Sequence, residues 1–181
     1  MIKRKPMGRK FARIARKPKI ARLRRIKPKK RKRATKADFL RSWGIFPGTW
    51  MRYSGIRGIY WFWFSRTVRE RDYKEHEGLC ITCGKYVEKG SDQACHIFAA
   101  SGCGFALLFH PLNVHLGHSK CNNPRFTPSA GVFNALNMEK RYGNGTIARL
   151  ATLKENKTKE WNRQEYEERI RQLPAYQASL Q

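Results

Sequence analysis

The sequence has few carboxylates. Its 181 residues include 13 Asp and Glu against 39 Lys and Arg, which gives a formal net charge of +26 at pH 7 and a pI of about 10.5. A positive charge of this size indicates a polyanionic partner, most often a nucleic acid, with an anionic membrane surface as the alternative. The length suggests one modest domain with appendages.

Long apolar runs are also missing. No segment approaches the run of about 20 apolar residues that spans a bilayer, and the amino terminus has no hydrophobic signal core. We therefore expect no membrane partner and a soluble, cytoplasmic protein, in the host cytoplasm if a phage encodes it. The five cysteines are an odd number. Without a signal segment, their spacing favours metal ligation by reduced thiols over disulfides.

Residues 1–37 form a basic, low-complexity arm that holds about half of all the Lys and Arg. We expect this arm to be disordered until a polyanion neutralises it. By releasing counterions from phosphates it would add affinity without sequence preference. A tail that serves only solubility or localisation is the alternative, since the run KPKKRKR resembles a nuclear address.

The rest of the chain divides into a linker and a domain. The linker is predicted over 38–55, where Pro47 and Gly48 mark a turn. The domain, over 56–174, begins with a helix over 56–75 whose aromatic cluster we assign to the core, with base stacking as the alternative. The remaining predicted segments are supporting helices over 127–142, 147–156 and 159–173, and a tail over 175–181.

The stretch 79–123 organises the domain. Cys80 and Cys83 are separated by two residues, and His118 and Cys121 repeat the same gap. A knuckle can place two thiolates at a metal while the first turn of a helix supplies two further ligands, and zinc prefers such a tetrahedral set of sulfur and nitrogen. We therefore predict a structural zinc, with four unrelated residues as the alternative.

Around this site the sequence predicts a ββα outline. Two short strands are expected over 78–98, the second of them over 93–98, followed by a loop over 99–111 and a helix that starts near Gly117. The predicted fold class is therefore α+β: a small zinc-stabilised core over 78–124, with flanking helices and a disordered basic arm.

His96, Asn113 and Asn122 follow one another in the order found in HNH-type (ββα-metal) nucleases. The amino-acid sequence resembles one family more closely than it resembles HNH nucleases in general. RERD followed by LCITCG, then A-x-H and NVHLGHSKCN, resembles the phage lambda NinG family, also called Rap, over roughly residues 56–173. Members of that family are structure-specific recombination endonucleases. The resemblance implies an endonuclease that hydrolyses phosphodiester bonds in branched DNA.

The resemblance also implies roles for single residues. His96 would be the general base that activates water, and Asn113 would pin the loop and orient His96. Asn122 would bind the catalytic divalent cation, magnesium or manganese, and Asp92 is the nearest upstream carboxylate that could join it. The implied zinc ligands are Cys80, Cys83, His118 and Cys121.

The sequence departs from these patterns at two positions. The family has Cys where His118 stands, although imidazole also suits zinc. Many HNH nucleases carry Asp directly before the catalytic His. Here that residue is Cys95, a soft ligand poorly matched to magnesium, and Asp92 lies about 13 Å from His96 along an unbent strand. A histidine with a pKa near 6.5 can act as a base close to neutral pH. The alternative for His96, considered without its neighbouring motifs, is a structural residue of the core.

Several side chains outside the arm are candidates for DNA contacts. Those predicted to meet nucleic acid are Arg66, Arg69, Arg71, His115 and Arg125. The sequence leaves the oligomeric state open, with a homodimer as a candidate, since symmetric cutting of a four-way junction would argue for a dimer. The main alternative function is a non-catalytic, zinc-stabilised nucleic-acid-binding protein of a ribosome or virion. A homing or restriction-type HNH nuclease is the alternative within the enzyme class.

Overall fold

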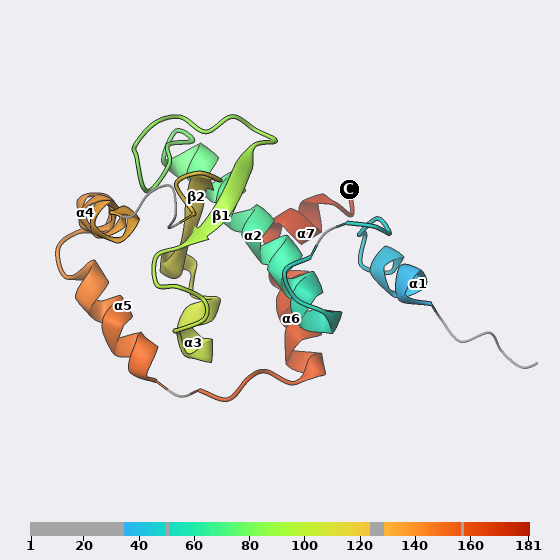
Figure 1. Cartoon of the computed structure of the whole chain (residues 1–181). Helices are drawn as coiled ribbons and strands as arrows, with labels where there is room; N and C mark the ends of the chain where they lie inside the picture. The colour runs from blue at the N-terminus through green and yellow to red at the C-terminus, as the bar shows by residue number, and fades with distance from the viewer. Residues whose placement is uncertain (1–34, 50, 124–128, 157) are drawn as a thin grey trace, which may run out of the picture. The chain divides into compact units, whose positions relative to one another are not determined.

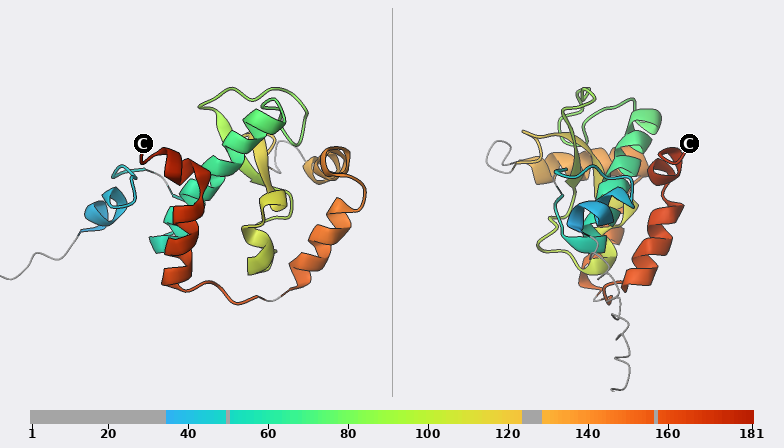
Figure 2. Two further views of the ribbon diagram at one scale, coloured as in Figure 1. Left: turned by 180° about the vertical axis from the view of Figure 1, so that it is seen from behind. Right: turned by 90° about the vertical axis from the view of Figure 1, so that its right-hand side faces the viewer.

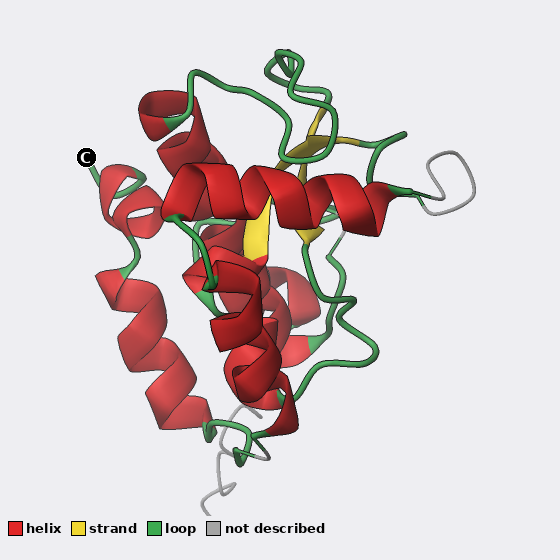
Figure 3. Ribbon diagram, turned by 90° about the vertical axis from the view of Figure 1, so that its left-hand side faces the viewer, coloured by secondary structure: helices red, strands yellow, loops and turns green. Residues whose placement is uncertain are grey.

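The computed structural model describes residues 35–49, 51–123, 129–156 and 158–181 (Figure 1). The segment Ala34–Gln181 is one compact unit. The basic arm predicted over 1–37 lies outside the described residues except for 35–37, so its disorder stays a prediction. The structure combines helices with one two-stranded sheet (Figure 3), which confirms the α+β class.

A long helix, α2 (Gly55–Glu75), forms the centre of this unit. The sheet lies against one face of it, as the view from behind shows (Figure 2), and α6 (Arg163–Gln172) and α7 (Pro174–Ala178) pack beside it. Four rings of its aromatic run are buried: Tyr60, Trp61, Trp63 and Phe64. The helix predicted over 56–75 and the assignment of its rings to the core are confirmed.

The segment before α2 is folded. Helix α1 (Lys36–Arg41) begins at Thr35, whose side chain accepts the Asp38 N–H in a capping box. Leu40, Trp43 and Ile45 are buried in the same cluster as the rings of α2. The indole N–H of Trp63 donates to the carbonyl of Trp43 over 3.1 Å. The linker predicted over 38–55 is therefore wrong, because these apolar side chains complete the core.

The sheet pairs β1 (Asp92–His96) with β2 (Val114–His118) in antiparallel register. The first strand predicted within 78–98 is wrong, because Leu79 and Tyr86 form only an isolated bridge. The helix predicted from Gly117 is also wrong, because this residue lies inside β2. A Cβ at Gly117 would stand 2.6 Å from the Cys95 Sγ, so the close approach of the two strands requires glycine.

The connection between the strands is partly helical. The predicted loop over 99–111 contains α3 (Phe105–Leu108), and a 3₁₀ turn, η1 (Pro111–Asn113), leads into β2. Leu107 is buried with Ile81, Met138 and Leu150, which joins this connection to the helices that follow.

The predicted helices after the sheet are present with adjusted ends. Helix α4 (Ala130–Tyr142) stops at Gly143 as predicted, while its predicted start at Thr127 and Pro128 lies outside the described residues. Helix α5 (Thr146–Glu155) matches the second prediction. Helix α6 begins later than predicted, because Asn162 caps it with Glu165.

The predicted tail over 175–181 is wrong, because α7 buries Ala175. Within the described ranges, no helix has both the length and the apolar content that crossing a membrane requires.

Candidate metal centre and active site

The four predicted zinc ligands meet. The ligand atoms of Cys80, Cys83, His118 and Cys121 all lie within 4.8 Å of one another. The Nδ1 atom of His118 is 3.5 Å from the Cys83 Sγ and 3.9 Å from the Cys121 Sγ. A tetrahedral zinc with ordinary bond lengths places sulfur and nitrogen about 3.6 Å apart. The cluster could therefore hold a structural zinc with little rearrangement.

The imidazole of His118 is oriented as a ligand. Its Nε2 lies 3.0 Å from the carbonyl oxygen of Tyr86 and donates a hydrogen bond to it. The proton is thereby placed on Nε2, and the lone pair of Nδ1 faces the thiols. His118 is the last residue of β2, and Cys121 lies in the turn that follows. The second ligand pair thus comes from a strand end and a turn, not from the first turn of a helix as predicted.

The three thiols of the cluster influence one another's ionisation. Burial and the neighbouring Cys80 and Cys83 raise the pKa of the Cys121 thiol to about 12. Several thiolates this close together repel one another unless a positive charge lies between them. A zinc held by the cluster would supply that charge and would couple ligand ionisation to folding.

The second feature is the imidazole of His96, the last residue of β1. Its Nε2 donates to the carbonyl of Leu108 over 3.1 Å, and its ring stacks on Trp61 with centroids 4.9 Å apart and planes at 13°. Burial lowers the pKa of His96 to about 4, with a further contribution from the charge of Arg52. The ring is therefore neutral near pH 7, and Nδ1 carries its lone pair.

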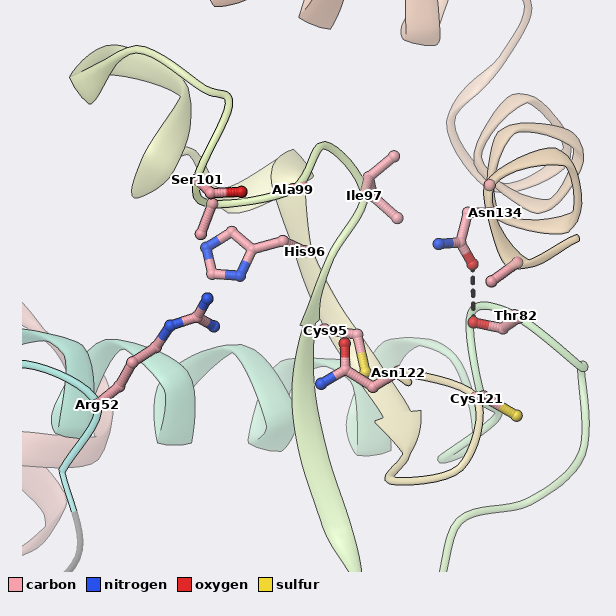
Figure 4. Close-up of a pocket in the computed structure, with 13 residues that line it drawn as sticks. Arg52, Thr82, Cys95, His96, Ile97, Ala99, Ser101, Cys121, Asn122 and Asn134 are labelled. Carbon is pink, nitrogen blue, oxygen red and sulfur yellow. Dashed lines mark hydrogen bonds between the residues drawn. The ribbon is translucent and has the colours of Figure 1, made fainter. Parts of the chain in front are cut away.

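His96 faces a cavity of about 340 Å³ (Figure 4). Asn122 lines the same cavity, and its side-chain N–H donates to Gln93 Oε1 over 3.1 Å. The amide oxygen of Asn122 is thus left to accept hydrogen bonds or to bind a cation. Arg52 lines the cavity as well, although the sequence predicted a linker there and nothing in its local pattern marks this residue.

Asp92 does not share that cavity. Its carboxylate pairs with Arg69 over 3.2 Å and accepts the Gly90 N–H over 2.8 Å. Asp92 lines a neighbouring cavity of about 350 Å³, and Asn122 borders both. The structure therefore brings Asn122 near both predicted partners but separates Asp92 from His96. Among the described residues, the Cys/His cluster is the one group of three or more His, Cys, Asp or Glu that could hold a metal.

Asn113 is completely buried at the end of η1. Its amide oxygen accepts the Phe98 N–H over 2.8 Å, and its amide nitrogen donates to the Leu107 carbonyl over 3.0 Å. These bonds tie the segment that follows His96 to α3. Leu108, whose carbonyl holds the His96 ring, is the next residue of α3. Asn113 is thus placed where it can fix the orientation of His96.

The predicted DNA contact at His115 is wrong. The side chain is completely buried, with Nδ1 3.2 Å from an Asp72 oxygen and Nε2 3.1 Å from the Leu112 carbonyl. It is therefore a structural residue between α2 and β2, and it does not reach a phosphate.

The predicted arginine contacts differ in availability. Arg71 is held inside the fold, because its guanidinium pairs with Asp72 and donates to the carbonyls of Pro111 and Val114. Arg69 is paired with Asp92.

Arg66 pairs with Glu70 one turn along α2, and its side chain is 51% exposed. Arg66 is thus the most accessible predicted contact among the described residues, and Arg125 lies outside them.

Comparison with known proteins places this chain in a phage context. The family model described as the bacteriophage lambda NinG protein matches residues 62–181. The match includes the Cys/His cluster and His96, Asn113 and Asn122, whereas Arg52 and α1 precede it. No curated protein and no solved structure matches the chain.

Proposed function

Because the chain belongs to the bacteriophage lambda NinG family, we propose that it is an HNH-type, metal-dependent endonuclease. Its substrate would be branched DNA formed in phage recombination, in the host cytoplasm. One observation carries the proposal. His96 is a neutral imidazole whose Nε2–H is held by Leu108, and it faces a cavity that Asn122 also lines.

The position and protonation state of His96 suit general base catalysis, while burial makes its ring a weaker base than the histidine of pKa near 6.5 that the sequence predicted. Hydrolysis of a phosphodiester needs a group that removes a proton from water as the water oxygen attacks phosphorus and the 3′ oxygen leaves. The Nδ1 lone pair of His96 can accept that proton, and the imidazolium that forms stays bonded to the Leu108 carbonyl. A positioned general base contributes roughly 10²–10⁴-fold to a rate.

Asn122 is the residue of this chain best placed for a catalytic magnesium or manganese ion. Its amide oxygen is a hard ligand, and magnesium commonly uses one or two protein ligands while water and phosphate oxygens fill the rest of its shell. Such an ion would stabilise the charge that develops on the phosphoryl and leaving oxygens. The carboxylate of Asp92 would join this shell only by breaking its pair with Arg69.

The Cys/His cluster has a supporting part in this proposal. Cys121 directly precedes Asn122, and β2 pairs with the strand that ends at His96. A zinc held by the cluster would therefore fix the turn that carries Asn122 relative to His96. Non-catalytic binding remains the alternative function, but it gives no reason for a neutral imidazole beside a hard ligand in one cavity.

Cleavage of defined DNA substrates tests the proposal. Purified zinc-loaded protein should cut flapped or four-way DNA faster than linear duplex in magnesium or manganese, and should cut none of them in EDTA. Asn122→Ala should lower the rate and recover part of it at high magnesium, whereas Asn144→Ala, on an exposed turn outside both cavities, should match the parent. Binding without cleavage of any substrate in either metal would favour the binding protein instead.

A further inference from the structure

The cavity in front of His96 has a basic wall that none of the predicted site residues supplies. Arg52 is exposed, precedes α2, and lines both cavities that Asn122 borders. Figure 4 shows its guanidinium directed toward the ring of His96. Arg52 therefore stands across the cavity from the candidate base, on a segment that precedes the family match.

Aromatic rings hold Arg52 in this position. The guanidinium carbon lies 5.7 Å from the ring centroids of both Tyr53 and Trp61. Trp61 is also the ring that stacks on His96. Cation–π contacts of this kind orient an arginine without occupying its N–H groups. The rings thus fix the direction of the side chain and leave its donors available.

The Arg52 guanidinium has no anionic partner among the described residues. Within the described part of the chain no hydrogen bond or ion pair involves Arg52, whereas nearby arginines of α2 are paired: Arg57 with Glu160, Arg66 with Glu70 and Arg69 with Asp92. The fork of N–H donors on a guanidinium matches the oxygens of a phosphate in a bidentate manner. An unpaired arginine at a cavity that holds a candidate base is suited to bind a phosphate there.

We propose that Arg52 binds the phosphodiester of a nucleic acid strand at the His96 cavity and positions its phosphorus in front of the Nδ1 of His96. The cleavage consequence of this inference rests on the proposed function, but the anion site itself does not. The site is assembled from a segment outside the family match and from β1 and the turn after β2 inside it.

A phosphate in this position would complete the electrostatics of the cavity. The unpaired guanidinium is close enough to lower the pKa of His96. An anion bound to Arg52 would offset that charge and stabilise the imidazolium as His96 accepts a proton. The same contact would thus orient the scissile bond and strengthen the base.

Binding of inorganic phosphate tests the anion site without any cleavage. The zinc-loaded full chain is titrated with phosphate at constant ionic strength, and the ring resonances of His96 are followed by NMR. The parent and Arg41→Ala should show a saturable shift, because Arg41 is an exposed residue of α1 outside both cavities. Arg52→Ala should show none, and Arg52→Lys should bind more weakly than the parent. An equal shift in Arg52→Ala, or no shift in the parent, would overturn the proposal.

Single-turnover cleavage of four-way DNA is the second readout. Loss of a charge-assisted, bidentate contact should lower the rate of Arg52→Ala by about 10- to 100-fold, with a smaller loss for Arg52→Lys. Arg41→Ala should cut at the parental rate. A parent that cuts nothing would refute the endonuclease and leave the phosphate titration to decide on Arg52. A parent that cuts, with Arg52→Ala equally active, would refute the role of Arg52 alone.

Discussion

The carboxylate of Asp72, near the end of α2, accepts a hydrogen bond of 2.7 Å from the backbone N–H of Leu116 in the middle of β2. The same carboxylate meets Arg71 over 2.6 Å and His115 over 3.2 Å. Asp72 is completely buried, so this contact fixes the central helix to the strand that ends at His118. Asp72 is thus one of the contacts that hold the Cys/His cluster in place relative to α2, together with the bonds of Arg71 to the Pro111 and Val114 carbonyls.

Replacing this carboxylate should destabilise the fold strongly. Asp72→Ala would leave the Leu116 N–H and the Arg71 guanidinium without their partner, and breaking a buried pair in this way costs about 3–5 kcal/mol. Urea unfolding of zinc-loaded protein measures the loss. Glu70→Ala breaks a half-exposed pair on the same helix and should change stability by less than about 1 kcal/mol. Equal stabilities for the two variants would contradict the structural role of Asp72.

Acid should remove the contribution of Asp72. Burial alone would raise its pKa, but the hydrogen bond and charge of His115, the charge of Arg71 and the Leu116 N–H outweigh burial and lower it below 3.8. A lowered carboxyl pKa contributes stability that is fully present above the unfolded value and is lost as the pH falls through the folded value. The stability difference between parent and Asp72→Asn should therefore be constant above pH 5 and shrink below about pH 4.

The Cys/His cluster should hold one zinc per chain. Cys83→Ser removes an exposed ligand and should reduce both the zinc content and the melting temperature, because structural zinc contributes directly to folding. Cys103→Ser changes a thiol outside the cluster and should keep the metal. Metal analysis with thermal melts checks both variants. Zinc retained at one equivalent in Cys83→Ser, with a parental melting temperature, would contradict the assignment.

Truncation should distinguish the role of the basic arm in DNA binding from the stability of the folded unit. Deleting residues 1–33 removes charge but keeps Thr35, which caps α1. The melting temperature should stay unchanged, while DNA affinity falls on every sequence and its salt dependence flattens. Deleting residues 1–55 also removes Leu40, Trp43 and Ile45 from the core and should unfold the unit. If the salt dependence of DNA affinity is unchanged after the shorter deletion, the arm does not contact phosphates.

His96 should remain neutral far below the ordinary range of histidine. Its pKa is lowered to about 4, so its ring resonances should not move between pH 7 and pH 5. Arg52→Ala removes a nearby positive charge and should raise the midpoint, whereas Arg41→Ala should not. Because unfolded His96 binds its proton near pH 6.5, this residue also lowers stability as the pH falls from 6.5 toward 4. A midpoint near 6.5 in the parent would contradict the burial of the ring.

The sequence predicted what local pattern determines. Helix α2 was predicted from the length and flanking charges of its segment, and the end of α4 from Gly143. The two-residue gaps predicted which thiols and imidazole lie together. Strand β2 was missed because its sequence, Val114–His118, has one β-branched residue and ends in a candidate metal ligand. Its pairing depends on Gly117, which leaves room for the Cys95 thiol.

Long-range packing explains the remaining errors. Nothing local indicates that Trp43 receives the Trp63 N–H, so a segment with turn residues was taken for a linker. His115 was predicted to contact DNA because its sequence neighbours do not indicate its burial. Its partner, the Asp72 carboxylate, lies 43 positions earlier in the chain. Arg52 became a candidate only when α2 and β1 placed Trp61 and His96 beside it.

The single-turnover rate of His96→Ala on four-way DNA in magnesium tests the assignment of the catalytic base most directly. We expect a loss of about 10²–10⁴-fold relative to the parent. The zinc content and DNA affinity should stay parental, because His96 is not among the candidate zinc ligands. The matched control is His110→Ala, since His110 lies outside both cavities and its side chain accepts only the Leu112 N–H among the described residues. Cleavage by His96→Ala at the parental rate would contradict the assignment of the base and, with it, the active site.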